Sequence, residues 1–221
     1  METLYIIPIL LFSVVVHEVM HGYVALKCGD PTAKYAGRLT LNPIPHIDLF
    51  GSILVPLFSL LIAGRVFIAW AKPVPVNPLN FRNYRRDSIL VSAVGPLSNL
   101  FLALCCAFAV ILLLNLEGFF NSFNSELIRF AYEFLVKMFY GGIYLNIVLG
   151  VFNLIPVPPL DGSHVLASIL PDRIGESYRQ IGFFGIFIVI FLMRVPAFSN
   201  IFFTIVRAIA TPIEFLINVF V

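Results

Sequence analysis

The sequence predicts an all-α, polytopic membrane protein. Of its 221 residues, 60% are hydrophobic and 12% are charged, whereas ordinary soluble domains carry about 25% charged residues. The mean hydropathy is +0.97, and several apolar runs reach the length of about 20 residues that a spanning helix needs. We therefore expect a single membrane-embedded domain over residues 1–221. The net charge of +2 is too small to indicate nucleic-acid binding, so we expect the lipid bilayer and no nucleic acid among its partners.

Four apolar segments qualify as spanning helices, and a fifth is shorter. The four are 3–26, 88–114, 134–155 and 199–220. The fifth, 180–196, lies between an arginine and a proline. One more segment, 49–71, is long enough to cross a bilayer, but two glycines, a proline and an arginine interrupt it. Its placement therefore needs a second argument.

Loop charge provides that argument for segment 49–71. The loop 27–48 carries three basic and two acidic residues, and 65–87 carries five basic residues and one acidic residue. Both are net positive, which is typical of cytoplasmic loops. If they share a side, 49–71 enters the membrane and returns, which is tolerated where the backbone lines protein or a wet cavity. We expect about five transmembrane helices, an outer amino terminus, and a re-entrant or β-strand-containing excursion between the first and second spans.

The first apolar segment ends in the motif His17-Glu18-Val19-Met20-His21. Histidines four residues apart on a helix differ by about 40° and about 6 Å, so both imidazoles project from one face. That spacing suits two ligands of a tetrahedral zinc ion, and Glu18 can take a proton from water beside them. Ionisable side chains within the bilayer are costly, so those that occur there are candidates for a functional role.

A catalytic zinc ion usually has three protein ligands, and Asp161 is the best candidate for the third. It follows residues 153–160, where three prolines break the third long span at membrane depth. Gly162 then permits a sharp turn or a close approach. The alternative is that Asp161 only caps a short amphipathic helix over 163–170, because aspartate is a good helix N-cap.

These motifs resemble those of the site-2 protease family of intramembrane zinc metalloproteases. The family's H-E-x-x-H corresponds to residues 17–21, and its N-x-x-P…D-G signature to residues 153–162. Gly95-Pro96-Leu97-Ser98-Asn99 resembles the element that opens the next core helix. Two more stretches, 41–48 and 71–78, look like those of compact members without PDZ or CBS modules. The resemblance covers roughly residues 10–170.

The resemblance implies a zinc-dependent metalloendopeptidase that hydrolyses peptide bonds in or near transmembrane segments, as in regulated intramembrane proteolysis. His17, His21 and Asp161 would hold one catalytic Zn²⁺ ion. Glu18 would be the general base and would later donate its proton to the leaving amine. Asn153 would donate to the substrate backbone or to the developing oxyanion.

Other polar residues receive separate interpretations. Asn99 is a weaker candidate for a contact with the substrate chain. His46 and Asp48 are expected mainly to fix a turn, with a second metal site or a substrate contact as the alternatives. An exposed strand edge near the metal, at 34–41 or 66–76, is expected to hold an unwound substrate by β-augmentation.

The resemblance also implies a partner, a location and an internal organisation. The partner would be a transmembrane protein substrate. The location would be a prokaryotic plasma membrane, crossed several times by the chain, with the active site toward the cytoplasmic side. Residues 1–170 would form the protease core, and residues 180–220 would form gate helices for substrate entry.

Two other functions would use the same residues. A divalent-cation transporter would use the two histidines and the aspartate as a transit site, but it needs a polar path to both faces. The outer halves of 88–114 and 134–155 are almost wholly apolar, which disfavours that path. A non-cleaving pseudoprotease would capture membrane proteins without a general base, so Glu18 disfavours that function.

Overall fold

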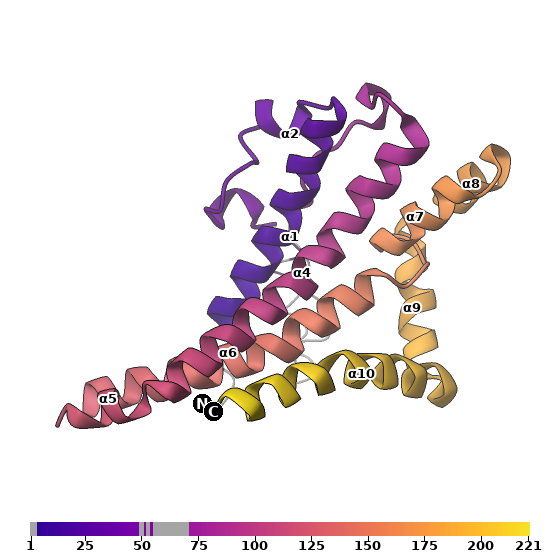
Figure 1. The fold of residues 1–221 in the computed structure, drawn as a ribbon. Helices are drawn as coiled ribbons and strands as arrows, with labels where there is room; N and C mark the ends of the chain where they lie inside the picture. Colours follow the sequence, from indigo (N-terminus) through magenta and orange to yellow (C-terminus); the bar gives the residue numbers. More distant parts are fainter. Residues whose placement is uncertain (1–3, 49–50, 52–53, 55–70) are drawn as a thin grey trace.

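The computed structural model describes residues 4–48, 51, 54 and 71–221, and all regular elements within them are helices (Figure 1). In chain order they are α1 (Ile6–Cys28), α2 (Thr32–Tyr35), η1 (Ile44–His46), η3 (Pro78–Asn80), α4 (Tyr84–Asn115), α5 (Glu117–Ser122), α6 (Glu126–Asn153), α7 (Asp161–Ile169), α8 (Asp172–Arg179), η4 (Gly182–Phe184), α9 (Gly185–Arg194) and α10 (Pro196–Phe220).

Four of these helices, α1, α4, α6 and α10, are long and apolar enough to span a membrane. They confirm the four longer predicted spans. Local sequence explains several of their ends. Gly29 adopts φ +112° and closes α1, Asn83 accepts a hydrogen bond from Arg86 N and caps α4, and Pro196 begins α10. Proline suits the first turn of a helix because its missing N–H has no partner there in any case.

The fifth predicted span, 180–196, is too short to cross a membrane as a single helix. Its longest helix, α9, has 10 residues, which amounts to about 15 Å. Residues Gly182–Arg194 bend by 71° from α8, so there is a fifth span only if this bent pair is counted as one. Gly182, with φ +52°, lies at the bend. A Cβ on Gly185 would lie 1.8 Å from the Pro158 carbonyl oxygen, so α9 packs directly on the loop before α7.

The prediction of strands in the excursion is wrong for the residues that the structure describes. Residues 34–41 hold the end of α2 and a turn, and residues 71–76 are extended but belong to no sheet. Pro73 and Pro75 lack N–H groups, so this edge cannot form a regular ladder. The Val74 N–H donates to Glu18 instead. The rest of segment 49–71, apart from residues 51, 54 and 71, lies outside the described residues.

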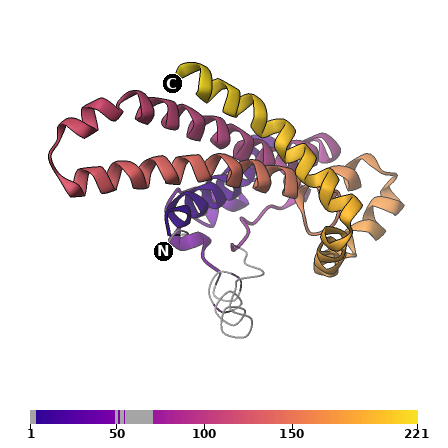
Figure 2. The same cartoon turned by 90° about the horizontal axis from the view of Figure 1, so that it is seen from below.

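The core lies between α1, α4 and α6. Ile143 and Ile147 of α6 are almost fully buried against Ala107 and Val110 of α4, and Ile9 of α1 packs on the same cluster. Helix α10 adds Phe202, Val206 and Ala210 to this cluster. Figure 2 shows α10 and α1 on opposite sides of the α4–α6 pair. The pair α4–α6 is therefore the central layer on which the other spans pack.

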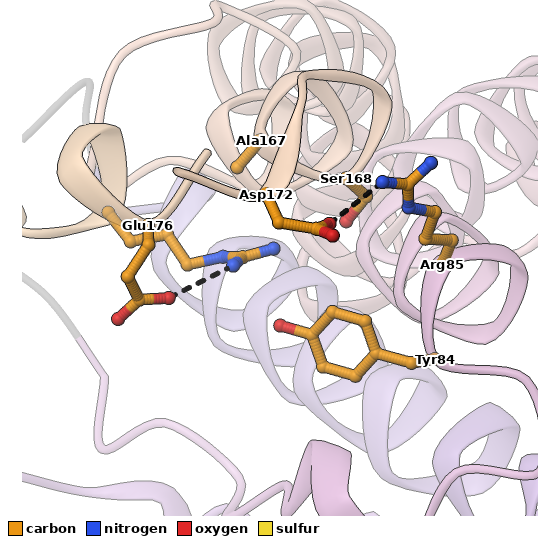
Figure 3. Close-up of a pocket in the computed structure, with 7 residues that line it drawn as sticks. Tyr84, Arg85, Ala167, Ser168, Asp172 and Glu176 are labelled. Carbon is orange, nitrogen blue, oxygen red and sulfur yellow. Dashed lines mark hydrogen bonds and ion pairs between the residues drawn. The ribbon is translucent and has the colours of Figure 1, made fainter. Parts of the chain in front are cut away.

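One ion pair and one cation–π contact connect α8 to the start of α4, and a second ion pair lies within α8 (Figure 3). Arg85 Nη2 donates to Asp172 Oδ1 at 2.7 Å, and Arg179 pairs with Glu176 at 3.4 Å within α8. The Arg179 guanidinium also lies 5.6 Å from the centre of the Tyr84 ring. Together these side chains line a pocket of about 300 Å³. They connect α8 to α4 at the polar ends of both helices.

A buried carboxylate connects the end of α1 to the segment that leads into α4. Asp30 has 0% exposure and accepts hydrogen bonds from Thr32 N and Oγ1, Asn77 N and Asn80 Nδ2. Burial alone would raise the pKa of Asp30, but the hydrogen bonds from Thr32, Asn80 and Asn77 outweigh it and lower the pKa. The ionised form is therefore the one that the fold stabilises.

We expect Asp30→Asn to lower the free energy of unfolding by about 1–3 kcal/mol. The NH₂ group of the new amide would face one of the N–H or O–H donors that now bond to the carboxylate, and two donors cannot form a hydrogen bond. Folding lowers the pKa of Asp30, so its stabilisation is fully present above the pKa of the unfolded state, about 3.9. The stabilisation is lost as the pH falls through the lower pKa of the folded state. Thermal unfolding in detergent at pH 7 and at lower pH measures both effects.

The matched control is Glu133→Gln, which removes an exposed carboxylate that pairs with Lys137 one helical turn away. Such surface pairs contribute about 0–1 kcal/mol. Equal melting temperatures for Asp30→Asn and the wild type at pH 7 would contradict the structural role of Asp30.

Candidate metal centre

The structure brings His17, His21 and Asp161 together. His17 Nε2 lies 3.1 Å from Asp161 Oδ2, and His21 Nε2 lies 3.3 Å from Asp161 Oδ1. The two Nε2 atoms lie 3.1 Å apart. One ligand atom from each of the three residues lies within 4.8 Å of the others, and we call this group the ligand cluster. Residues about 140 positions apart in the chain thus meet at one point.

Local sequence places each member of the ligand cluster. The histidines are one turn apart on α1, and Asp161 begins α7 directly after the proline-rich loop 154–160. A Cβ on Gly162 would lie 2.2 Å from the Leu154 carbonyl oxygen, so only glycine lets α7 start this close to the end of α6. This close approach turns the first residue of α7 toward α1.

Gly95 packs directly against the imidazoles. A Cβ at this position would lie 2.3 Å from His21 Nε2 and 2.7 Å from His17 Cε1. Both distances are far below van der Waals contact, so any side chain here would displace the histidines. The glycine of the Gly-Pro-Leu-Ser-Asn motif therefore lets the backbone of α4 lie directly against both imidazoles.

Hydrogen bonds to Nδ1 orient both imidazoles. His17 Nδ1 lies 2.7 Å from Asn99 Oδ1, and His21 Nδ1 lies 2.6 Å from the Val91 carbonyl oxygen. Carbonyl oxygens only accept hydrogen bonds, so each Nδ1 must carry the proton. Nε2 of each imidazole is therefore the atom that faces the ligand cluster, as in metal-binding histidines.

The amide orientation of Asn99 is fixed from a third helix. Asn99 Nδ2 donates to Asn146 Oδ1 at 3.0 Å, and Asn146 Nδ2 donates to the Gly142 carbonyl oxygen at 2.9 Å. Because the Gly142 carbonyl can only accept, this chain of bonds leaves Asn99 Oδ1 for His17. We call Asn99, Asn146 and the Gly142 carbonyl the asparagine relay. Both asparagines have 0% exposure.

Three hydrogen-bond acceptors therefore converge in the ligand cluster. The two Nε2 lone pairs face each other and a carboxylate, and the buried Asp161 Oδ2 has no hydrogen-bond donor among the described residues. Such an arrangement is favourable only when a cation, either a proton or a metal ion, lies between the acceptors. Ligand atoms around a tetrahedral zinc ion lie about 3.3–3.5 Å from one another. The observed separations of 3.1–3.3 Å are close to that value, so these residues fit a single zinc ion.

Glu18 lies beside the ligand cluster without joining it. Its Oε2 accepts a hydrogen bond from Val74 N at 2.7 Å, and the side chain is partly buried. Val74 is flanked by Pro73 and Pro75, so its N–H is the only backbone donor in that stretch of three residues. The extended segment thus holds one carboxylate oxygen of Glu18.

Two predicted substrate contacts lie in different surroundings. Asn153, at the end of α6, is partly buried, and its Nδ2 donates to the Leu149 carbonyl oxygen one turn earlier at 3.0 Å. Its role as a donor to the substrate stays a prediction. Asn99 is fully buried against His17 and has no surface for a substrate chain.

His46 and Asp48 lie outside the ligand cluster. His46 is 2% exposed, its Nε2 lies 3.0 Å from the Thr40 carbonyl oxygen, and its own carbonyl oxygen accepts from Lys72 N. Asp48 Oδ1 accepts from Gly51 N at 2.6 Å. These contacts agree with the expected role of both residues in fixing a turn.

Sequence reasoning missed the Val91 carbonyl, Asn146, the close packing at Gly95 and the Val74 N–H. One of them left a signal in the sequence, because Asn146 is the lone amide in the apolar run of residues 141–152. A backbone carbonyl or N–H leaves none, since every residue but proline has both groups.

Comparison with known proteins finds one matching family and several relatives. The model of "Peptidase family M50" matches residues 5–195. "Putative zinc metalloprotease YwhC" from Bacillus subtilis is 37% identical over 204 residues, which cover 92% of this chain and 86% of that protein. "Putative zinc metalloprotease Rip2" from Mycolicibacterium smegmatis is 28% identical over 200 residues, which cover 89% of this chain and 69% of that protein. No solved structure is significantly similar to the chain.

We expect Asn146→Leu to weaken zinc binding although Asn146 touches no member of the ligand cluster. Without Asn146 Oδ1, the Asn99 amide can rotate and offer its NH₂ group to His17, which turns the imidazole lone pair away from the metal. Loss of such an outer partner costs about 10- to 100-fold in metal affinity. Competition with a chelator, measured on the purified protein in detergent, gives that affinity.

Asn115→Leu is the matched control, because Asn115 bonds carbonyl oxygens at the far end of α4 and α10. It should bind zinc as the wild type does. If Asn146→Leu also retained wild-type affinity, the asparagine relay would have no role in orienting His17.

Proposed function

The chain belongs to peptidase family M50, which confirms its resemblance to the site-2 proteases, and on this premise we propose how its side chains act. It is a zinc metalloprotease, and its substrates are therefore proteins. Its four long apolar helices make it a multi-pass membrane protein. The assignment of residues, the class of substrate and the orientation in the membrane are the parts that we infer below.

In this proposal His17, His21 and Asp161 hold one catalytic zinc ion. The observation that supports it is the convergence of two Nε2 lone pairs and a carboxylate within 3.1–3.3 Å. When bound, zinc acidifies a water molecule and polarises the carbonyl of the scissile peptide bond.

Glu18 is the general base of the proposed reaction. Val74 N holds its Oε2 at 2.7 Å, and no hydrogen bond engages Oε1 within the described part of the chain. We infer that Oε1 takes the proton from the attacking water and returns it to the leaving amine, as general acid–base catalysis requires. Asn153 would donate to the substrate or to the oxyanion after releasing the carbonyl of its own helix.

The depth of the ligand cluster supports cleavage in or near transmembrane segments. His21 lies seven residues before the end of α1, which is about 10 Å along the helix. A substrate helix reaching this depth must unwind, because its carbonyls are otherwise occupied by helical hydrogen bonds. Water must also enter, and the polar end of α1 near Lys27 and Asp30 is the shorter route.

We infer that this end of α1 faces the cytoplasm of a prokaryotic cell, with the protein in its plasma membrane. The loops 27–48 and 65–87 are both net positive, which is typical of cytoplasmic loops. It stays a prediction that residues 180–220 form gate helices and that residues 1–170 form the protease core. A cation transporter or a non-cleaving binder is not favoured, because the matching family is one of peptidases.

Glu18→Gln tests the assignment of the base. We expect it to retain zinc and to lose cleavage of a helical membrane peptide by about 10²- to 10⁴-fold, because the amide cannot take a proton. The measurements are metal content of the purified protein and peptide cleavage in detergent. The control is Glu126→Gln, which removes an exposed carboxylate at the start of α6. This variant should cleave the peptide normally.

Asp161→Ala tests the ligand set separately. It removes one of three proposed ligands, so zinc content should fall together with activity. If Asp161→Ala kept full zinc, the ligand set would be wrong. If Glu18→Gln kept full activity, Glu18 would not be the base, whatever the metal content.

A further inference from the structure

Helix α10 carries a stripe of polar side chains along its whole length. They recur at alternating spacings of four and three residues, in the order Asn200, Thr204, Arg207, Thr211, Glu214 and Asn218. At about 100° per residue, this spacing keeps all six within about 40° of one line along the helix. We call this line the polar stripe.

The polar stripe is not the face that packs into the protein. The buried side chains of α10 are Phe202, Val206, Ala210, Ile213 and Ile217, and their mean direction is about 120° away from the stripe. Five members of the polar stripe are exposed, and only Glu214 is partly buried. A regular polar line on the outside of a spanning helix is unusual, because lipid offers no hydrogen bonds to it.

Two members of the polar stripe have partners within the chain. Tyr144 of α6 donates a short hydrogen bond to Glu214. Thr211 Oγ1 donates to the Arg207 carbonyl oxygen at 2.8 Å, which satisfies the hydroxyl within the helix. Hydroxyls that bond to their own helix in this way are tolerated at membrane depth.

Arg207 is the cationic member of the polar stripe. It lies near the middle of α10, and its guanidinium has no hydrogen bond or ion pair among the described residues. Arginine near the centre of a spanning helix is strongly unfavourable, and such residues normally pair or face a polar partner. The complement that this position calls for is a carboxyl group at the same depth.

We propose that the polar stripe is the docking face for a transmembrane helix of another membrane protein, one that places a carboxyl side chain beside Arg207. Small or polar residues of that helix would lie against Thr204 and Thr211. Contacts of this kind drive association of helices in lipid, where packing of polar and small side chains replaces the hydrophobic effect. The inference does not depend on proteolysis or on the metal.

A second copy of this chain does not supply that carboxyl group. Glu18 is held by Val74 N, Asp87 is fully buried, and Glu214 is held by Tyr144. Segments 49–71 and 180–196 contain no aspartate or glutamate. A two-fold axis along the membrane normal would also place Arg207 beside its own copy, which is repulsive. The charge pattern therefore favours a different protein.

The test uses the full chain, labelled and reconstituted in phosphatidylcholine vesicles, with two synthetic spanning peptides. Both are leucine- and alanine-rich helices, and they differ only in a single aspartate or leucine at the centre. Energy transfer measures binding. We expect the aspartate peptide to bind roughly tenfold more tightly than the leucine peptide. Arg207→Leu should remove this preference, and Arg207→Lys should retain part of it.

Arg194→Leu is the matched control, since it removes an arginine from the last turn of α9 and leaves the polar stripe intact. It should keep the preference, and unchanged zinc content verifies that each variant is folded. Equal binding of the two peptides to the wild type would overturn the proposal, as would a preference that survives in Arg207→Leu. Energy transfer between copies of the protein is measured in parallel. If Arg207→Leu abolished that transfer, the polar stripe would serve self-association, and the proposal would be overturned.

Discussion

His17, His21 and Asp161 direct acceptor atoms at one another across 3.1–3.3 Å, and this convergence constrains the structure around it. Two Nε2 atoms and a carboxylate at that distance need a cation among them, either a proton or a metal ion. The surrounding elements serve to keep them there. The loop before α7 brings the aspartate back to α1, Gly95 lets α4 lie directly against the rings, and bonds to both Nδ1 atoms prevent the rings from turning.

Polar groups inside the apolar spans are handled in two different ways. Near the candidate metal centre, Asn99 bonds Asn146 and His17 across three helices. Glu18 is likewise held by a backbone N–H. On α10 the polar stripe faces outward, with Arg207 unpaired within the described part of the chain. The first arrangement is complete within one molecule, whereas the second requires a partner from outside.

The expectations that held rest on patterns within short stretches of sequence. Apolar length identified α1, α4, α6 and α10, because a helix must be about 20 residues long to cross a bilayer. The strand prediction failed where local hydrogen-bond donors are missing, since Pro73 and Pro75 cannot join a ladder. The fifth predicted span does not reach spanning length by itself, because the chain bends by 71° between α8 and Gly182–Arg194.

The sequence alone identified the residues of the candidate metal centre. H-E-x-x-H places two imidazoles on one helical face wherever that helix lies, and the proline-rich loop ahead of Asp161 has its own signature. The tertiary structure decided how those residues are oriented. Which nitrogen of each ring faces the metal depends on the Val91 carbonyl and on Asn99, which come from another helix. No pattern along the chain encodes that choice, because it depends on how α1, α4 and α6 pack against one another.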